Sequence, residues 1–189
     1  MSLPLVLLVA IAPVGAFDML YFHLWKFRLF ASPASRAETL THVLRSLVFA
    51  ALAWTLAHYR PQGAWFWAVA ALFAIDFLNS LIDVAIEPRS RAARGGVPTA
   101  EALIHNTGTT ALGAIAALFV TDGWHARLLP TALRPVTHPD FLVLQAELIA
   151  ASGILLATLE LALLISSWTG CCRLKLPWLH RQPEGHHAP

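Results

Sequence analysis

The chain has 189 residues, of which 57% are hydrophobic and 13% are charged, and its formal net charge is +2. Because soluble domains usually carry about 25% charged residues, this composition predicts an integral membrane protein. It excludes a nucleic-acid-binding protein, since the few basic residues are scattered rather than gathered on one strongly positive face.

Five apolar segments are long enough to cross a hydrocarbon core of about 30 Å, which takes roughly 20 helical residues. The predicted spans are residues 3–24, 40–59, 64–86, 100–121 and 141–168. The first segment has no basic residues before its apolar run, so we interpret it as a span rather than a signal peptide. We therefore expect an all-α, polytopic membrane bundle: one transmembrane domain, residues 1–170, followed by a short tail, residues 171–189.

The basic residues predict the orientation of this bundle. Nine of them lie on the side that holds the first connection, the third connection and the tail: Lys26, Arg28, Arg36, Arg89, Arg91, Arg94, Arg173, Lys175 and Arg181. Only Arg60, Arg127 and Arg134 lie on the other side. By the positive-inside rule, we expect the N-terminus outside and the C-terminus in the cytoplasm.

Acidic residues and histidines occur at the same end of four predicted spans. Because successive spans run in opposite directions, all of these residues are expected at one depth near the cytoplasmic face. They are Asp18 and His23 in the first span, Glu38 and His42 at the start of the second, Asp83 and Glu87 at the end of the third, and Glu101 and His105 at the start of the fourth. Each Glu-x-x-x-His pair places a carboxylate and an imidazole one helical turn apart, as in a chelating site.

These eight residues predict a metal site near the cytoplasmic face. Five carboxylates and three imidazoles are too many for a single four-coordinate zinc, so we expect two divalent metal ions. Mixed oxygen and nitrogen ligands favour iron, with zinc or manganese as alternatives. His23 poses a geometric problem, because it is about 140° from Asp18 on an ideal helix. Both can face one site only if the first helix is distorted or ends between them.

A structural interpretation of the acids is also open. Glu38 and Glu101 are placed where ordinary helix starts favour an acid, whereas Asp18, Asp83 and Glu87 oppose a helix dipole. Ion pairs with Arg45, Arg89 or Arg91 are the other alternative for these carboxylates.

Further polar residues are predicted around the metal site. Asp76 and Asn79 share a face of about 80° with Asp83 and Glu87 but lie deeper, so we expect them, with Tyr21, to line a substrate or proton path. Arg45 and Glu160 are candidate supporting residues. No role is assigned to Glu147, and Cys171 and Cys172 are interpreted as inert thiols near the membrane surface.

The motifs FDMLYFHLWKFRL, ETLTHVLRS, DVAIEPRSR and EALIHN, over residues 17–110, resemble those of a family of small, uncharacterised bacterial multi-pass membrane proteins. The resemblance implies a location in the bacterial inner membrane and a shared site made of the eight residues named above. Leu24 and Pro88 stand where the family pattern has acidic residues. The dense histidine clusters of membrane desaturases are absent from the sequence.

The predicted metal site and membrane location suggest three functions. The leading hypothesis is a di-iron oxidoreductase that acts on a lipid or other apolar substrate in the bilayer, with a redox partner or a second copy of the chain as possible partners. The first alternative is a dinuclear zinc hydrolase of a lipid ester, amide or phosphate. The second is a protein that binds or transports metal ions or protons.

Overall fold

The computed structural model describes residues 3–169, and the tail with Cys171 and Cys172 lies outside the described residues. The chain forms five long helices, which confirms the predicted all-α fold class. They are α1 (Leu3–Phe17), α2 (Arg36–His58), α3 (Ala64–Arg91), α4 (Thr99–Gly123) and α5 (Asp140–Thr169). Shorter helical segments are η1 (Asp18–Lys26), η2 (Leu29–Ala31), η3 (Pro33–Ser35), η4 (Ala92–Arg94) and η5 (Trp124–Leu128). With these segments included, five helical stretches are long and apolar enough to cross a membrane.

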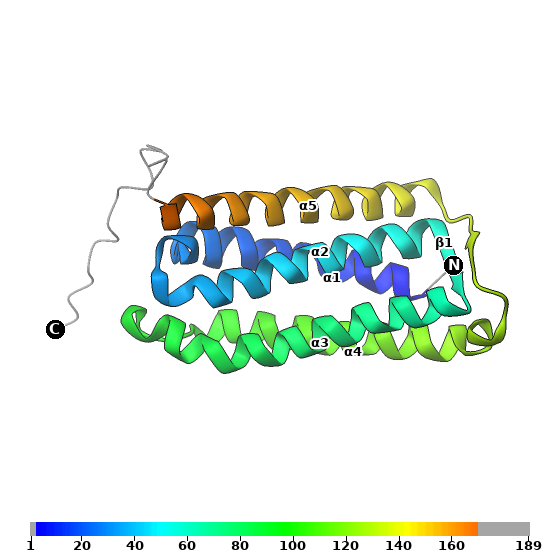
Figure 1. The fold of residues 1–189 in the computed structure, drawn as a ribbon, viewed down its shortest axis with the longest axis horizontal. Coiled ribbons are helices and arrows are strands. Elements are labelled where there is room, and N and C mark those ends of the chain that lie inside the picture. Colours follow the sequence, from blue (N-terminus) through cyan, green and yellow to red (C-terminus); the bar gives the residue numbers. More distant parts are fainter. Residues whose placement is uncertain (1–2, 170–189) are drawn as a thin grey trace.

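The long helices run side by side along one axis (Figure 1). The most extensive packing is that of α2 against α5, and α2 also packs on α3. On the other side, α1 packs against α4, and α4 returns to α3. This arrangement surrounds the interior with all five helices, so residues from four or five of them can meet at one depth.

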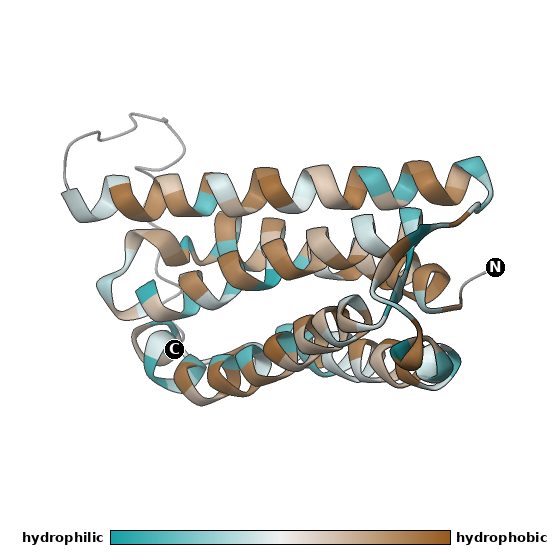
Figure 2. Cartoon of the chain, turned by 45° about the vertical axis from the view of Figure 1, so that its right-hand side comes forward, coloured by the Kyte–Doolittle hydropathy of each residue, from teal (hydrophilic) through white to brown (hydrophobic). Residues whose placement is uncertain are grey.

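Large hydrophobic side chains are exposed on the outside of the bundle, as a bilayer requires. Hydrophobic residues recur along the helices (Figure 2). Phe77, Leu78, Val84 and Leu155 are each more than half exposed. The buried polar side chains lie instead in the interior of the bundle, between the helices. A surface more apolar than parts of its interior supports a membrane location, while the predicted orientation of the termini stays a prediction.

Two helices extend further than hydropathy predicts. The third span was expected to end at residue 86, but α3 continues to Arg91 through Pro88. Glu87, Ser90 and Arg91 are buried in this last turn. Their side chains contact other residues inside the bundle, and these contacts stabilise the helix beyond its apolar run. Similarly, α2 begins at Arg36 and not at residue 40, which brings Glu38 into its first turn.

A small antiparallel ladder joins the two connections at the opposite end of the bundle. Strand β1 (Tyr59–Gln62) pairs with β2 (Ala132–Pro135), in register from Tyr59 opposite Pro135 to Gln62 opposite Ala132. The pairing joins residues about 70 positions apart, which local patterns do not reveal. Gly63 follows β1 directly and has φ +58°. A Cβ at this position would lie 2.8 Å from the Leu129 carbonyl oxygen, so glycine is required there.

Gly153 permits the close approach of α5 to α2, because a Cβ at this position would lie 2.8 Å from the Ser46 carbonyl oxygen. Small residues serve this purpose between membrane helices. Gly153→Ala is expected to lower the free energy of unfolding by about 1–3 kcal/mol through overpacking. Thermal unfolding in detergent measures the effect.

Gly113→Ala is the matched control, since a Cβ there meets nothing within 4 Å. Both substitutions gain the same helix propensity, so the control should be at least as stable as the unmodified protein. Equal melting temperatures for the two variants would contradict a tight α2–α5 contact at Gly153.

Candidate metal centre

All eight predicted metal ligands meet inside the bundle, where each is at most 8% exposed. Their ligand atoms form four overlapping groups, and within each group all atoms lie within 4.8 Å of one another. The groups are Asp18, His23, Glu101 and His105; His23, Glu38 and His42; Asp83, Glu87 and His105; and Glu38, Glu87 and Glu101. The buried acids and histidines could therefore hold metal ions.

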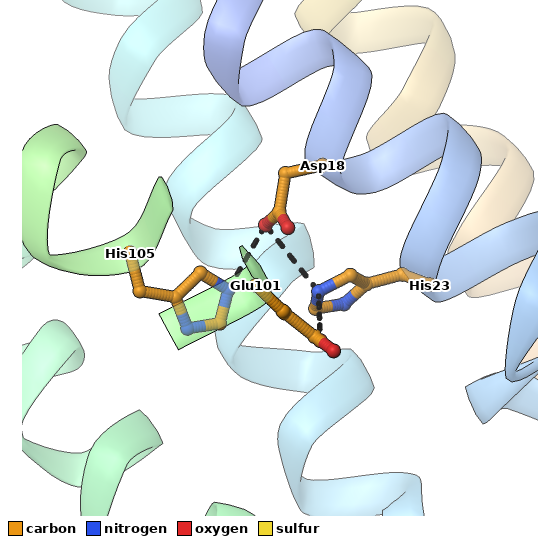
Figure 3. Close-up of side chains that lie close together, drawn as sticks. All are labelled: Asp18, His23, Glu101 and His105. Atoms are coloured by element: carbon orange, nitrogen blue, oxygen red, sulfur yellow. Dashed lines mark hydrogen bonds and ion pairs between the residues drawn. The ribbon is translucent and has the colours of Figure 1, made fainter. Parts of the chain in front are cut away.

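The four-residue group has the spacing of a coordination sphere (Figure 3). His23 Nε2 lies 3.4 Å from Asp18 Oδ2 and 3.3 Å from Glu101 Oε1. His105 Nε2 lies 2.9 Å from the same Asp18 oxygen. Metal bonds of about 2.0–2.2 Å place neighbouring ligand atoms roughly 3 to 3.5 Å apart, which matches these separations.

A π-helix brings Asp18 and His23 to the same face. The first span changes at Asp18 from an α-helix to the π-helix η1, and the Phe27 N–H donates to the Phe22 carbonyl five residues earlier. Hydrogen bonds from i to i+5 bring residues five apart nearly into line, unlike in an α-helix. The distortion required for His23 to face the site is therefore present, and such π-helical turns are frequent at functional sites.

His105 contacts a different carboxylate with each ring nitrogen. Its Nε2 faces Asp18, while its Nδ1 lies 2.9 Å from Glu87 Oε1. His105 thus belongs both to the four-residue group and to the group with Asp83 and Glu87. A carboxylate on the second nitrogen orients an imidazole and raises its basicity as a ligand.

His42 completes the set from α2. Its ring meets that of His23 edge to face at 4.0 Å, and its Nε2 lies 3.7 Å from Asp83 Oδ1. Among the described residues, both ring nitrogens of His23 and Nε2 of His42 are buried without a hydrogen-bond partner. Leaving a buried polar atom unsatisfied costs about 1–3 kcal/mol, so these nitrogens fit a role as metal ligands.

Arg91 adds a buried cation to the site, whereas the sequence indicated it only as an alternative ion-pair partner of the acids. This side chain is fully buried; its Nη2 lies 2.7 Å from Glu38 Oε1 and also bonds Glu101. Its guanidinium lies over the Phe27 ring at 4.6 Å. Arg91 follows Glu87 by one turn of α3, so the helical spacing indicated that both side chains lie on the same face of the helix.

The formal charges around the centre suit two divalent ions. The five carboxylates and the Arg91 guanidinium leave four negative charges, if the imidazoles are neutral. Arg45 is paired with a further acid, since its Nε lies 3.5 Å from Asp76 Oδ1. Two divalent cations would offset the remaining charge, which a low-dielectric interior strongly favours.

The predicted path residues divide into two kinds. Asp76 is buried beside Arg45, which also bonds Ser80. Asn79 instead donates to the Thr41 carbonyl at 2.8 Å and holds α3 to α2. Thr41 in turn donates to Asp83 Oδ1 at 2.6 Å, so this contact helps to orient a candidate ligand.

Three other acidic or aromatic residues lie outside the four groups. Tyr21 is half-buried and stacks on Phe17 at 5.2 Å. Glu160 is buried in α5, and its Oε2 has no hydrogen-bond partner among the described residues. Glu147 lies 3.2 Å from His58, near the β1–β2 end.

A cavity of about 310 Å³ adjoins the centre. Asp18, His42 and His105 line one end of it, together with Arg45 and Asp76. The rest of the lining is mainly apolar, and most of it comes from α1, α4 and α5. Three candidate ligands are therefore accessible from an apolar space inside the bundle.

Comparison with protein-family models, with curated proteins and with solved structures gives no match. The resemblance to bacterial multi-pass membrane proteins stays a prediction.

Proposed function

We propose that this chain is a membrane-embedded dinuclear metalloenzyme, and specifically a di-iron oxidoreductase that acts on an apolar molecule from the bilayer. The observation that carries the proposal is that eight buried acids and histidines gather beside a mainly apolar cavity, which Asp18, His42 and His105 line directly. A bacterial inner membrane is the location that we propose for it.

Two shared histidines support two neighbouring metal ions over one. His23 and His105 each belong to two groups, and the three groups that contain them include all eight residues. The charge balance with Arg91 supports the same number. Carboxylates and histidines from four helices are the ligand set of di-iron and di-manganese bundles, although their usual spacing is Glu-x-x-His.

The chain's own residues would perform three tasks around bound metals. The carboxylates and imidazoles hold the ions, and Arg91 fixes Glu38 and Glu101 in place. Glu87 orients the ring of His105. The apolar lining excludes water from the face where Asp18, His42 and His105 meet the cavity. Iron with such ligands supplies redox chemistry with O₂ when bound.

A transport function receives less support from the cavity. Its ionisable lining residues are Asp18, His42, Arg45, Asp76 and His105, all at or near the metal centre. Toward Val9 and Gln145, none of the lining residues within the described range 3–169 is ionisable. An ion crossing the membrane would have to leave its ligands for an apolar region, at a cost of several kcal/mol.

Elemental analysis of the protein purified from membranes without added metal tests the proposal. We expect about two iron ions per chain, as in other carboxylate bundles, with visible or near-ultraviolet absorption. Two zinc ions in a colourless protein would instead favour the hydrolase, since zinc is d¹⁰. Protein that binds no transition metal, even after reconstitution, would overturn both.

A further inference from the structure

We infer that the cavity beside the metal centre binds an amphiphile with one hydrocarbon chain and an uncharged, hydrogen-bonding head group such as a hydroxyl, carbonyl or amide. The inference rests on the proposed function, because it takes this cavity as the substrate site. It goes further by naming the class of substrate and the direction in which the molecule lies.

The lining of the cavity is polar at one end and apolar at the other. Every ionisable residue of the cavity is at or within about two helical turns of the metal centre. The other end is formed by residues such as Val9, Ile11, Leu148 and Ile149. A ligand that matches both ends has a polar head against the centre and an apolar tail directed away from it.

The cavity is long and has a small volume. The lining residues on α5 extend from Gln145 to Leu156, which corresponds to about 16 Å along the helix. Ligand cavities commonly measure about 300–1,000 Å³, so a volume of about 310 Å³ is at the small end of that range. A long cavity of small volume suits one hydrocarbon chain and not a two-chain phospholipid.

The charged residues at the polar end of the cavity disfavour an anionic head group. Apart from histidines, Arg45 is the only cation among the described residues of the lining, and it already lies 3.5 Å from Asp76 and 4.0 Å from Asp83. A free anionic head would therefore meet two carboxylates beside one guanidinium. Asp76 Oδ1 and Arg45 Nε form an ion pair 3.5 Å long but, among the described residues, make no hydrogen bond, so one can still accept and the other donate. A neutral head with the complementary groups satisfies both atoms.

Two glycines of α4 allow a matched test. Gly108 lines the cavity, whereas Gly113 lines a separate groove of about 530 Å³ between α3 and α4. A Cβ at either position meets nothing within 4 Å, so a larger side chain can be introduced without a backbone clash. Gly108→Leu fills part of the cavity, and Gly113→Leu leaves it open.

The experiment is photolabelling of the full chain in dioleoylphosphatidylcholine vesicles, with the labelled residues identified by mass spectrometry. The probe is hexadecanol with a diazirine in its chain, and phosphatidylcholine with the same diazirine chain is the two-chain comparison. We expect the alcohol to label cavity residues of α1 and α5, such as Val14 and Ile149. Gly108→Leu should reduce this labelling about tenfold, which corresponds to a modest loss of binding free energy, while Gly113→Leu should preserve it.

Three labelling patterns would each overturn the inference. They are cavity labelling that Gly108→Leu does not reduce, equal labelling of the cavity by the two-chain lipid, and labelling confined to outward residues such as Leu78. Unlabelled hexadecanol should also compete better than hexadecanoate, and the reverse order would overturn the uncharged head group. Metal content is measured on the same samples. Cavity labelling without metal supports the ligand class and overturns the proposed enzyme, whereas metal without cavity labelling overturns the inference alone.

Discussion

His105→Gln is expected to reduce the bound metal from about two ions per chain to one or fewer, because its ring contributes to two of the four acid and histidine groups. Nε2 faces Asp18 and Nδ1 faces Glu87, so the substitution disturbs both groups at once. Loss of a partner that only orients a ligand typically weakens metal binding about 10- to 100-fold, and loss of the ligand itself should cost at least as much. Elemental analysis after dialysis against a mild chelator measures the result.

His58→Gln is the matched control for this prediction. His58 also lies on a membrane-spanning helix and also contacts a carboxylate, at 3.2 Å from Glu147 Oε1. It belongs to none of the acid and histidine groups among the described residues. The control should keep its full metal content, and an equal loss in both variants would indicate a general destabilisation instead of a missing ligand.

The meeting of the eight acids and histidines could be predicted because depth in a membrane can be read from sequence. Hydropathy places the helix ends, and alternating direction brings the end of one span beside the start of the next. The two Glu-x-x-x-His pairs then fall at one depth, as the structure shows for Glu38, His42, Glu101 and His105. Metal binding by these residues stays a prediction, since proximity alone does not identify a ligand.

Other features could not be read from periodicity. The π-helix at Asp18 inserts a change of pitch that standard α-helical spacing does not contain, so the face of His23 was ambiguous. The β1–β2 pairing depends on a contact between distant connections. The burial of Arg91 could not be predicted, because arginine near the end of a predicted span is usually assigned to the loop that follows. Each of these depends on tertiary structure, which local patterns record poorly.

The position of Arg91 changes how the stability of the centre should be understood. A fully buried guanidinium between Glu38 and Glu101 is a fixed counter-ion that remains whether or not metal is bound. Ser90 donates to the remaining oxygen of Glu38, so that carboxylate is held from two sides by the last turn of α3. This turn is the part of the helix that hydropathy failed to predict, and it connects the folding of the bundle to the geometry of the site.

Arg91→Met is accordingly expected to lower the free energy of unfolding by about 3–5 kcal/mol, because it leaves two carboxylates buried without their counter-ion. Arg89→Met is the control: Arg89 lies on the same turn but is exposed, so its replacement should change stability by less than about 0.5 kcal/mol. Equilibrium unfolding in mixed detergent micelles compares the two variants after metal has been removed from both. Adding Glu38→Gln to Arg91→Met should recover part of the loss, since replacing both partners of a buried ion pair costs less than replacing one. Equal stabilities of the two methionine variants would contradict the role of Arg91 as the counter-ion of Glu38 and Glu101.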